Sequence, residues 1–334
     1  MPAYCNVKGN MMKNVTLKFA VLSALTVLSA PVFATGFVSL PAAGLTVAAT
    51  TNQPAGTTGW VRCNTTGNYG SGEFTAPTTG ANNTCAVFPG AINTTPVTGF
   101  TLVSASNLTS TITANSETLA TMTSRTFRNT ANTECIYGKR ISFATTGTFD
   151  YNPQLTGSQR LEVNDVAFGG FSATAGVSAG YYYTSITDSP VYRMGRAFTS
   201  VQMQSDLANV ATLPATGFVH RPLNSPAPTA STEINGVGQT LTGSVGTLVP
   251  TAAQQTSEIR TNWVDFTMDN TGGVDEDGTT VQDTSMMYVR AACTSAAPVS
   301  TANTVRIRQA GQETQPWVTI LAPGLTRSGA NANF

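Results

Sequence analysis

Apolar and polar residues alternate along much of this chain with a period of two, which is typical of β-strands that bury one face. The pattern is clearest within residues 161–204, where Val177, Ala179, Tyr181 and Tyr183 occupy alternate positions. Glycine residues and a Ser-Pro pair interrupt this stretch at intervals that suit turns between strands. We therefore expect residues 161–204 to form the central antiparallel strands of a β-sandwich.

Shorter alternating stretches flank this region on both sides. They read FTLVSAS, TSTITANSETLATM, CIYGKRISFATTGTFDY, NWVDFTMDN, SMMYVRAAC, TVRIRQAG and PWVTILA. The chain as a whole predicts an all-β fold with an antiparallel β-sandwich architecture, built as one large sandwich or as two adjacent ones.

The chain divides into three parts by sequence pattern. Residues 1–34 resemble a cleaved signal peptide, and residues 35–152 form an N-terminal β region with a disulfide-tied hairpin. Residues 153–334 form the central and C-terminal β-sandwich, although a turn within one domain explains the boundary equally well. Residues 205–257 lack a sustained period and are rich in Pro, Ala, Thr and Gly, so we expect a long irregular excursion there.

The N-terminal part has the order of features found in secretory leaders. Met12 is the expected true start, because Lys13 and Lys18 follow it and precede an apolar helical run over residues 19–30. This run is shorter than the roughly 20 residues of a membrane-spanning helix. Cleavage after Ala34 would release an exported chain without an integral membrane segment.

The mature N-terminus offers a second interpretation besides an ordinary first strand. An extended, alternating terminus can complete the sheet of a neighbouring subunit through backbone hydrogen bonds. The residues of this possible donor strand are Phe37, Val38, Leu40, Leu45, Val47 and Ala49.

Composition excludes some partners. Charged residues make up 10% of the chain, and removal of the leader takes away three of the 17 basic residues, leaving 14 against 17 acidic ones. A slightly acidic protein is not expected to bind nucleic acid. Lys139 is then the only lysine left.

Four cysteines follow the leader, namely Cys63, Cys85, Cys135 and Cys293. An even number in an exported chain favours two disulfides. Three pairings are open, and proximity favours Cys63 with Cys85, which leaves Cys135 with Cys293. No Cys-x-x-Cys motif or nearby histidine supports zinc, and no motif suggests another cofactor.

Gly176 to Gly180 matches the G-x-S-x-G pattern of serine hydrolases. Ser178 is followed by acidic residues and by His220, the only histidine, in the hydrolase order. However, no alternation of strands and helices surrounds the motif, so small residues within a strand are the favoured explanation and we expect no enzymatic activity.

Two other residue groups could bind a ligand. Tyr181, Tyr182, Tyr183 and Trp317 could offer stacking surfaces to a carbohydrate. An acidic turn could bind calcium through Asp269, Asp275, Glu276 and Asp277, although its spacing does not match an EF-hand and a solvated turn is the favoured reading.

Charged residues in the central region favour a structural interpretation. Glu162, Asp165, Arg193 and Arg196 could pair across adjacent strands. Such networks more often support a sheet than form a functional site.

Several blocks of sequence together resemble a known family: TGFVSLP, RCNTTGNYGSG, CAVFPG, FDYNP, LEVNDVAFGGFS, SPVYRMGRAFTSVQ and NWVDFTMD. They are similar to the secreted FilA-like proteins of Fil-type fimbrial clusters in Gram-negative bacteria. The resemblance implies a fimbrial or fimbria-associated subunit that acts in attachment. It implies as partners other fimbrial subunits or further copies of the chain, a periplasmic chaperone and usher, and a host or abiotic surface.

The sequence therefore predicts an exported structural or adhesive protein that passes through the periplasm to the cell surface or the medium. A secreted carbohydrate-binding module is the alternative, and a secreted serine hydrolase using Ser178 is the third hypothesis.

Overall fold

The computed structural model describes residues 36–47, 56–63, 76–79, 84–114, 117–145, 161–171, 176–185, 187–196, 260–272, 281–309 and 318–332. The chain divides into two compact units, residues 1–34 and 35–334, and every described residue belongs to the second. The predicted signal peptide and the predicted excursion 205–257 therefore lie outside the described residues.

The described part is all-β, as the sequence predicts, and its only helix is the short 3-10 helix η1 (Ser104–Ser106). Its strands are β1 (Val38–Ser39), β2 (Leu45–Val47), β3 (Gly56–Thr58), β4 (Trp60–Arg62), β5 (Phe100–Leu102), β6 (Leu108–Ala114), β7 (Glu117–Asn129), β8 (Glu134–Phe143), β9 (Glu162–Gly169), β10 (Ser178–Tyr182), β11 (Asp188–Ser189), β12 (Arg193–Gly195), β13 (Trp263–Thr271), β14 (Asp283–Thr284), β15 (Met286–Ala292), β16 (Val299–Gln309) and β17 (Val318–Thr326).

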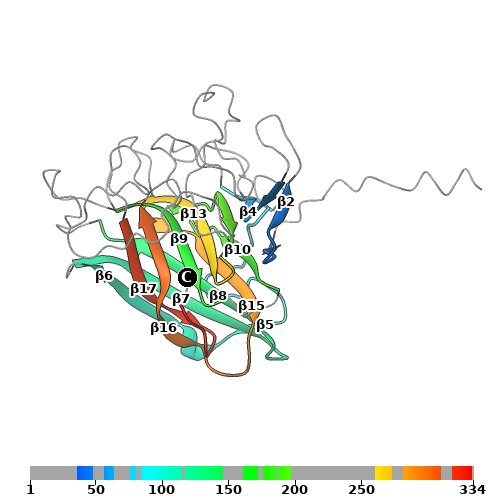
Figure 1. The fold of residues 1–334 in the computed structure, drawn as a ribbon. Coiled ribbons are helices and arrows are strands. Elements are labelled where there is room, and N and C mark those ends of the chain that lie inside the picture. Colours follow the sequence, from blue (N-terminus) through cyan, green and yellow to red (C-terminus); the bar gives the residue numbers. More distant parts are fainter. Residues whose placement is uncertain are drawn as a thin grey trace, which may run out of the picture. The chain divides into compact units, whose positions relative to one another are not determined.

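Two large sheets contain most of these strands (Figure 1). In the nine-stranded sheet, β10 lies between β1 and β15, β15 pairs with β8, β8 pairs with β7, and β7 pairs with both β5 and β6. The short strands β14 and β11 extend the sheet beside β8. The six-stranded sheet has the order β17-β16-β9-β13-β12-β4, and β2 and β3 form a separate hairpin. Both large sheets contain strands from either side of residue 152.

One apolar core joins the two large sheets. In the six-stranded sheet, alternate residues such as Val264 and Phe266 on β13 point into it, and in the nine-stranded sheet Met287 and Val289 on β15 do the same. All four are completely buried. The two-residue period seen in the sequence therefore separates the residues that face this core from those that do not.

A second apolar cluster covers the other face of the nine-stranded sheet. Phe127, Ile136 and Tyr288 project from β7, β8 and β15 away from the central core. Apolar side chains of the segment 87–102 belong to the same cluster and include Val87 and, on β5, Phe100. The nine-stranded sheet is thus buried on both faces over part of its area.

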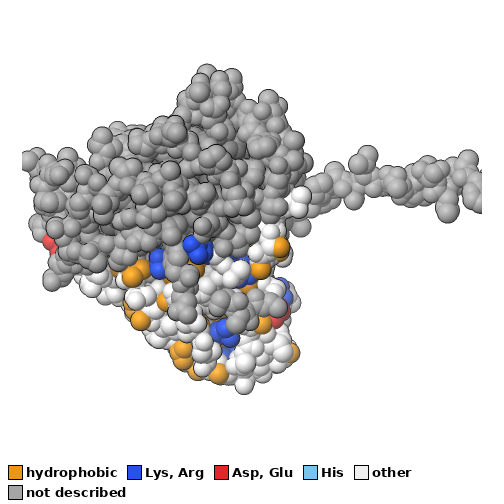
Figure 2. All heavy atoms as spheres, in the orientation of Figure 1, with side chains coloured by type: hydrophobic (Ala, Val, Ile, Leu, Met, Phe, Trp, Pro, Cys, Tyr) orange, Lys and Arg blue, Asp and Glu red, His pale blue; other side chains and the backbone are white. Residues whose placement is uncertain are grey.

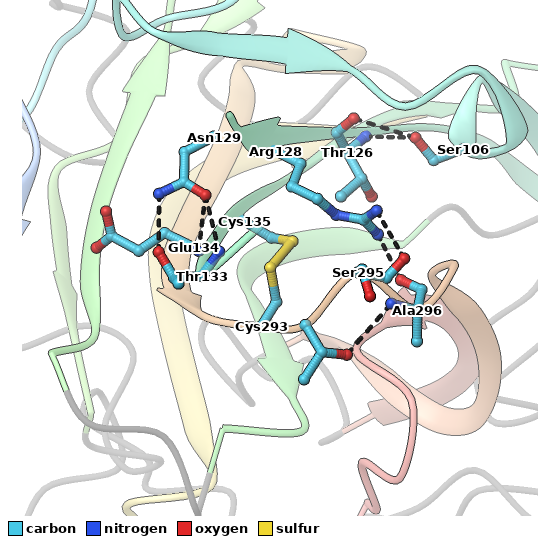
Figure 3. Close-up of a disulfide and its surroundings, with 11 residues drawn as sticks. Ser106, Thr126, Arg128, Asn129, Thr133, Glu134, Cys135, Cys293, Ser295 and Ala296 are labelled. Carbon is cyan, nitrogen blue, oxygen red and sulfur yellow. Dashed lines mark hydrogen bonds between the residues drawn. A yellow bond between two sulfur atoms is a disulfide. The ribbon is translucent and has the colours of Figure 1, made fainter. Parts of the chain in front are cut away.

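A disulfide between Cys135 and Cys293 fixes the point where the chain leaves β15 for the other sheet (Figure 3). The Arg128 guanidinium reinforces this link, because it donates hydrogen bonds to the carbonyl oxygens of Ser295, at 2.9 Å, and Ala296. This cysteine pairing is the one that the sequence favours. The disulfide restrains the connection from β15 to β16.

Lys139, the only lysine after residue 34, lies between the two sheets and is 1% exposed. Its ammonium nitrogen is 4.4 Å from the ring centroid of Phe168 and donates to the Leu325 carbonyl at 3.1 Å. Burial lowers the pKa of Lys139 from 10.5 to about 7. The amine is therefore much more easily deprotonated than a solvated lysine.

We expect Lys139→Met to flatten the dependence of stability on pH. Between about pH 7 and 10.5 the unfolded chain binds a proton that the folded chain lacks, so the free energy of unfolding rises with pH across this window. The total rise is about 5 kcal/mol. The variant should be more stable than the wild type near neutral pH, as measured by urea unfolding at several pH values. An equal slope in both proteins would contradict a buried, easily deprotonated lysine.

Candidate functional site

The candidate functional site is the outer edge of β10. All five β10 residues pair with β15 on one side. On the other side, β1 pairs only at Val38 and Ser39, and a single parallel bridge joins Ala86 to Tyr181. The Leu40 amide adds one hydrogen bond, to the carbonyl oxygen of Val177 at 2.8 Å. Few backbone contacts therefore hold β1 in place.

The side chains of β1 and its neighbours alternate between the two apolar clusters. Leu40, which is 1% exposed, and Val38 pack on the central core. Phe37 points to the opposite face, where its ring centroid lies 6.1 Å from that of Tyr288. Full burial of a leucine contributes about 1.5–3 kcal/mol, so Leu40 is the principal anchor of this segment.

The segment around Cys85 occupies the rest of the β10 edge. The Tyr181 amide donates to the Cys85 carbonyl at 3.0 Å, and the Val87 amide donates to the Tyr181 carbonyl at 2.8 Å. A Cβ at Gly180 would lie only 3.1 Å from the Cys85 carbonyl oxygen. Glycine at this position therefore permits the close approach of the covering segment.

The second disulfide, between Cys63 and Cys85, connects this edge to the other sheet. Cys63 directly follows β4 of the six-stranded sheet, and its amide donates to the Tyr192 carbonyl at 2.8 Å. The two Cα atoms are 5.1 Å apart, and this pairing is again the one that proximity in the sequence favours. The Cys85 segment is thus held covalently, whereas β1 is held only by noncovalent contacts.

The structure separates the residues of the predicted donor strand. Phe37, Val38 and Leu40 lie in or beside β1, but Leu45 and Val47 belong to β2, which pairs with β3. A turn divides the two groups, with the Gly44 amide donating to the Pro41 carbonyl at 3.0 Å and Gly44 at a φ of 84°. Ala49 lies outside the described residues. The part of the stretch that covers β10 is therefore residues 37–40.

A cluster of buried charges lies on the face of the six-stranded sheet opposite the core. Arg308 on β16 donates to both carboxylate oxygens of Asp165 on β9 and to Asp265 on β13, the last at 3.0 Å. All three side chains are completely buried. Burial and the adjacent Asp165 carboxylate raise the pKa of Asp265 well above its usual range. Burial lowers the pKa of Arg308, but the two carboxylates outweigh that effect and raise it.

Two arginine–tryptophan stacks flank this charge cluster. The Arg193 guanidinium lies 4.3 Å from the ring centroid of Trp60, and the Arg306 guanidinium lies 4.7 Å from that of Trp263. Both tryptophans are at most 1% exposed. Burial and the neighbouring Arg308 lower the pKa of Arg306 to about 10. Cation–π contacts of this kind are strongest where water is excluded.

Sequence reasoning identified only part of this cluster. The sequence places Asp165 and Arg193 among the charged residues that could pair across adjacent strands. In the structure Asp165 binds Arg308, and the Arg193 Nε donates to Thr267 at 3.1 Å. The roles of Asp265 and Arg308 were missed. Trp263 was an available signal, because it shares strand parity with Asp265 and a tryptophan on that face indicates that the face is covered.

The structure describes only some of the other candidate residues. Ser178 lies in β10, paired with Ser39 and Arg290, and is not on a strand-to-helix turn. His220 lies outside the described residues. Tyr181 is completely buried and cannot stack on a carbohydrate, whereas Tyr182 and Tyr183 are half-buried.

The predicted calcium site is described at one residue only. Asp269 lies on β13 and is 8% exposed, and Asp275, Glu276, Asp277 and the stacking candidate Trp317 lie outside the described residues. Within the ranges that the structure describes, no group of three or more metal-binding side chains occurs.

Comparison with protein-family models, with curated proteins and with solved structures found no match to this chain. In the described ranges, no helix has the length and hydrophobicity that a membrane span requires.

We expect Arg308→Leu to destabilise the fold by about 3–5 kcal/mol, because it removes the guanidinium that donates hydrogen bonds to two buried carboxylates. The loss should be measurable by urea unfolding and should shrink as the pH falls, since protonation removes the uncompensated charge. As a control, adding Asp165→Asn and Asp265→Asn to this variant should recover much of the stability. A small loss of stability that does not change with pH would contradict the stabilising role of Arg308 in the ion cluster.

Proposed function

We propose that this chain is an exported structural subunit of a cell-surface fimbria, or a protein associated with one, that acts in attachment. In this proposal the two large sheets form a single β-sandwich, stapled by both disulfides. Support comes from the leader-like sequence, the family-like sequence blocks and the two disulfides, which suit an oxidising compartment. The chain would cross the inner membrane, pass through the periplasm and end at the cell surface.

The observation that carries the proposal is the weak attachment of β1 to β10. A terminal segment that contributes two paired residues and one buried leucine anchor can leave without breaking the rest of the sheet. When copies of the chain exchange this identical segment, each copy regains the same contacts. The net free-energy cost of the exchange is therefore small. The β1 segment of one subunit would then complete the β10 edge of the next.

This mechanism also indicates what the partners would do. Without its covering strand, the β10 edge exposes unpaired backbone groups and the apolar surface that Leu40 otherwise covers. Both favour aggregation. A periplasmic chaperone that lends a strand would protect the edge until an usher delivers the next subunit. Other fimbrial subunits, or further copies of the chain, would be the final occupants.

We place the contact with a host or abiotic surface in the predicted excursion 205–257. The residues on either side of it are held together, because the Arg260 amide donates to the Arg196 carbonyl at 2.6 Å. Arg196 also donates to the carbonyl oxygen of Thr261. The last described residue after β12 and the first one before β13 are therefore hydrogen-bonded to each other, so the sequence between them can vary without changing either strand.

The exchange can be tested with cysteines at Val38 and Ala179, which are directly paired between β1 and β10. In an isolated monomer, Val38→Cys/Ala179→Cys should form a bond within one chain. In assembled fibres the same bond should join neighbouring chains, so that denaturing, nonreducing gels show a ladder of oligomers. Val38→Cys alone is the matched control and should give no ladder.

Two results would refute strand exchange. One is a fibre in which every Val38→Cys/Ala179→Cys bond is intramolecular. The other is normal fibre formation by Leu40→Asp, because a carboxylate at the buried anchor should prevent seating of β1, whereas Ser39→Asp on the exposed side should assemble normally.

A further inference from the structure

The strand β6 forms the opposite end of the nine-stranded sheet from β1. It pairs with β7 along all seven of its residues, and no other described strand pairs with it. Thr109, Thr111 and Thr113 are exposed, and Ile112 points into the core. A regular strand at this position presents a row of backbone donors and acceptors on its outer side.

Among the residues that the structure describes, the neighbouring segment of the same edge is protected against pairing, whereas β6 is not. Between β5 and β6, the helix η1 interrupts the edge, and the Ser106 hydroxyl accepts the Thr126 amide of β7 at 2.9 Å. At the edge of the other sheet, β17 contains Pro323, which cannot donate a backbone hydrogen bond.

By contrast, the sequence of β6, LTSTITA, has no charge, no proline and no glycine. The pairing between β6 and β7 contains a β-bulge near Ile112. Its extra residue, Leu119, lies on β7, so β6 itself is a regular strand. Proteins commonly protect a free edge with charges, prolines or bulges, and β6 has none of these in its own sequence. Its first residue, Leu108, is also 44% exposed, one of three large apolar side chains that are exposed in the described ranges.

Two copies of β6 are compatible with each other. In an antiparallel pair centred on Thr111, Thr109 of each copy faces Thr113 of the other. Threonine pairs favour cross-strand contact, and no like charges oppose each other. On the face that Figure 2 shows, the described surface is mostly white, with scattered hydrophobic side chains, several basic ones and few acidic ones. An isologous contact of this kind closes at two copies.

We infer that β6 is the site at which a second copy of this chain pairs edge to edge, which joins two nine-stranded sheets into one continuous sheet. This contact is separate from the proposed exchange of β1, because β10, β15, β8 and β7 lie between the two edges. It would connect subunits side by side, whereas exchange of β1 connects them end to end.

The test is a charge swap at Thr111, followed by analytical ultracentrifugation over a range of concentrations. The unmodified mature chain should dimerise. Thr111→Lys and Thr111→Glu should each weaken dimerisation by roughly tenfold or more, because each places like charges opposite one another. An equimolar mixture of the two variants should restore a heterodimer.

The matched control is Thr121→Lys. Thr121 is exposed and directly opposite Thr111 on β7, but it lies one strand inside the edge, so this variant should dimerise like the unmodified chain. Thr111→Cys should form a disulfide-linked dimer under oxidation, and Thr121→Cys should not. The dimerisation and crosslinking results should be the same when these substitutions are added to Val38→Cys/Ala179→Cys, in which a disulfide within the chain holds β1 on β10. The test of β6 therefore does not depend on whether β1 exchanges between copies.

A monomer at all concentrations would overturn the inference. Dimerisation of Thr111→Lys with unchanged strength, or failure of the charge-swapped mixture to recover, would do the same. Circular dichroism of each variant establishes that the fold is intact, and crosslinking of Thr111→Cys gives an answer that does not depend on a charged substitution.

Discussion

The backbone groups along the outer edge of β10 need partners, and this requirement organises much of the molecule. β10 faces the apolar core on one side and the second apolar cluster on the other, so its edge is adjacent to buried surface. Each buried backbone group that stays unpaired costs a free energy comparable to that of a lost hydrogen bond. The chain satisfies them with a covalently held segment at Cys85 and a loosely held one at β1.

This division separates a rigid body from a removable part. The Cys63–Cys85 disulfide joins the two sheets beside the edge, and the Cys135–Cys293 disulfide fixes the end of β15. The buried Arg308 cluster connects three strands of the six-stranded sheet. None of these links involves β1, so the body can persist while its edge strand changes partners. Elements with few buried contacts are the ones that open most readily.

The sequence predicted the strands, the all-β class and both cysteine pairs, because alternation and cysteine proximity depend on local spacing. It did not predict which polar faces are covered. Alternation shows that Asp265 and Arg308 point away from Phe266 and Ile307, but it does not show that this second face is also buried. It also suggested one donor stretch over residues 37–49, whereas the turn from Pro41 to Gly44 divides it between two sheets.

Amide hydrogen exchange tests the central claim most directly, by comparing the purified monomer with the assembled protein. If β1 is a removable cover, the amides of β1 and of Leu40 should exchange much faster in the monomer than those of β8, and should become protected on assembly. If these amides are protected as strongly as β8 in the monomer and do not change on assembly, then β1 is a permanent strand and the proposed joint between subunits is wrong.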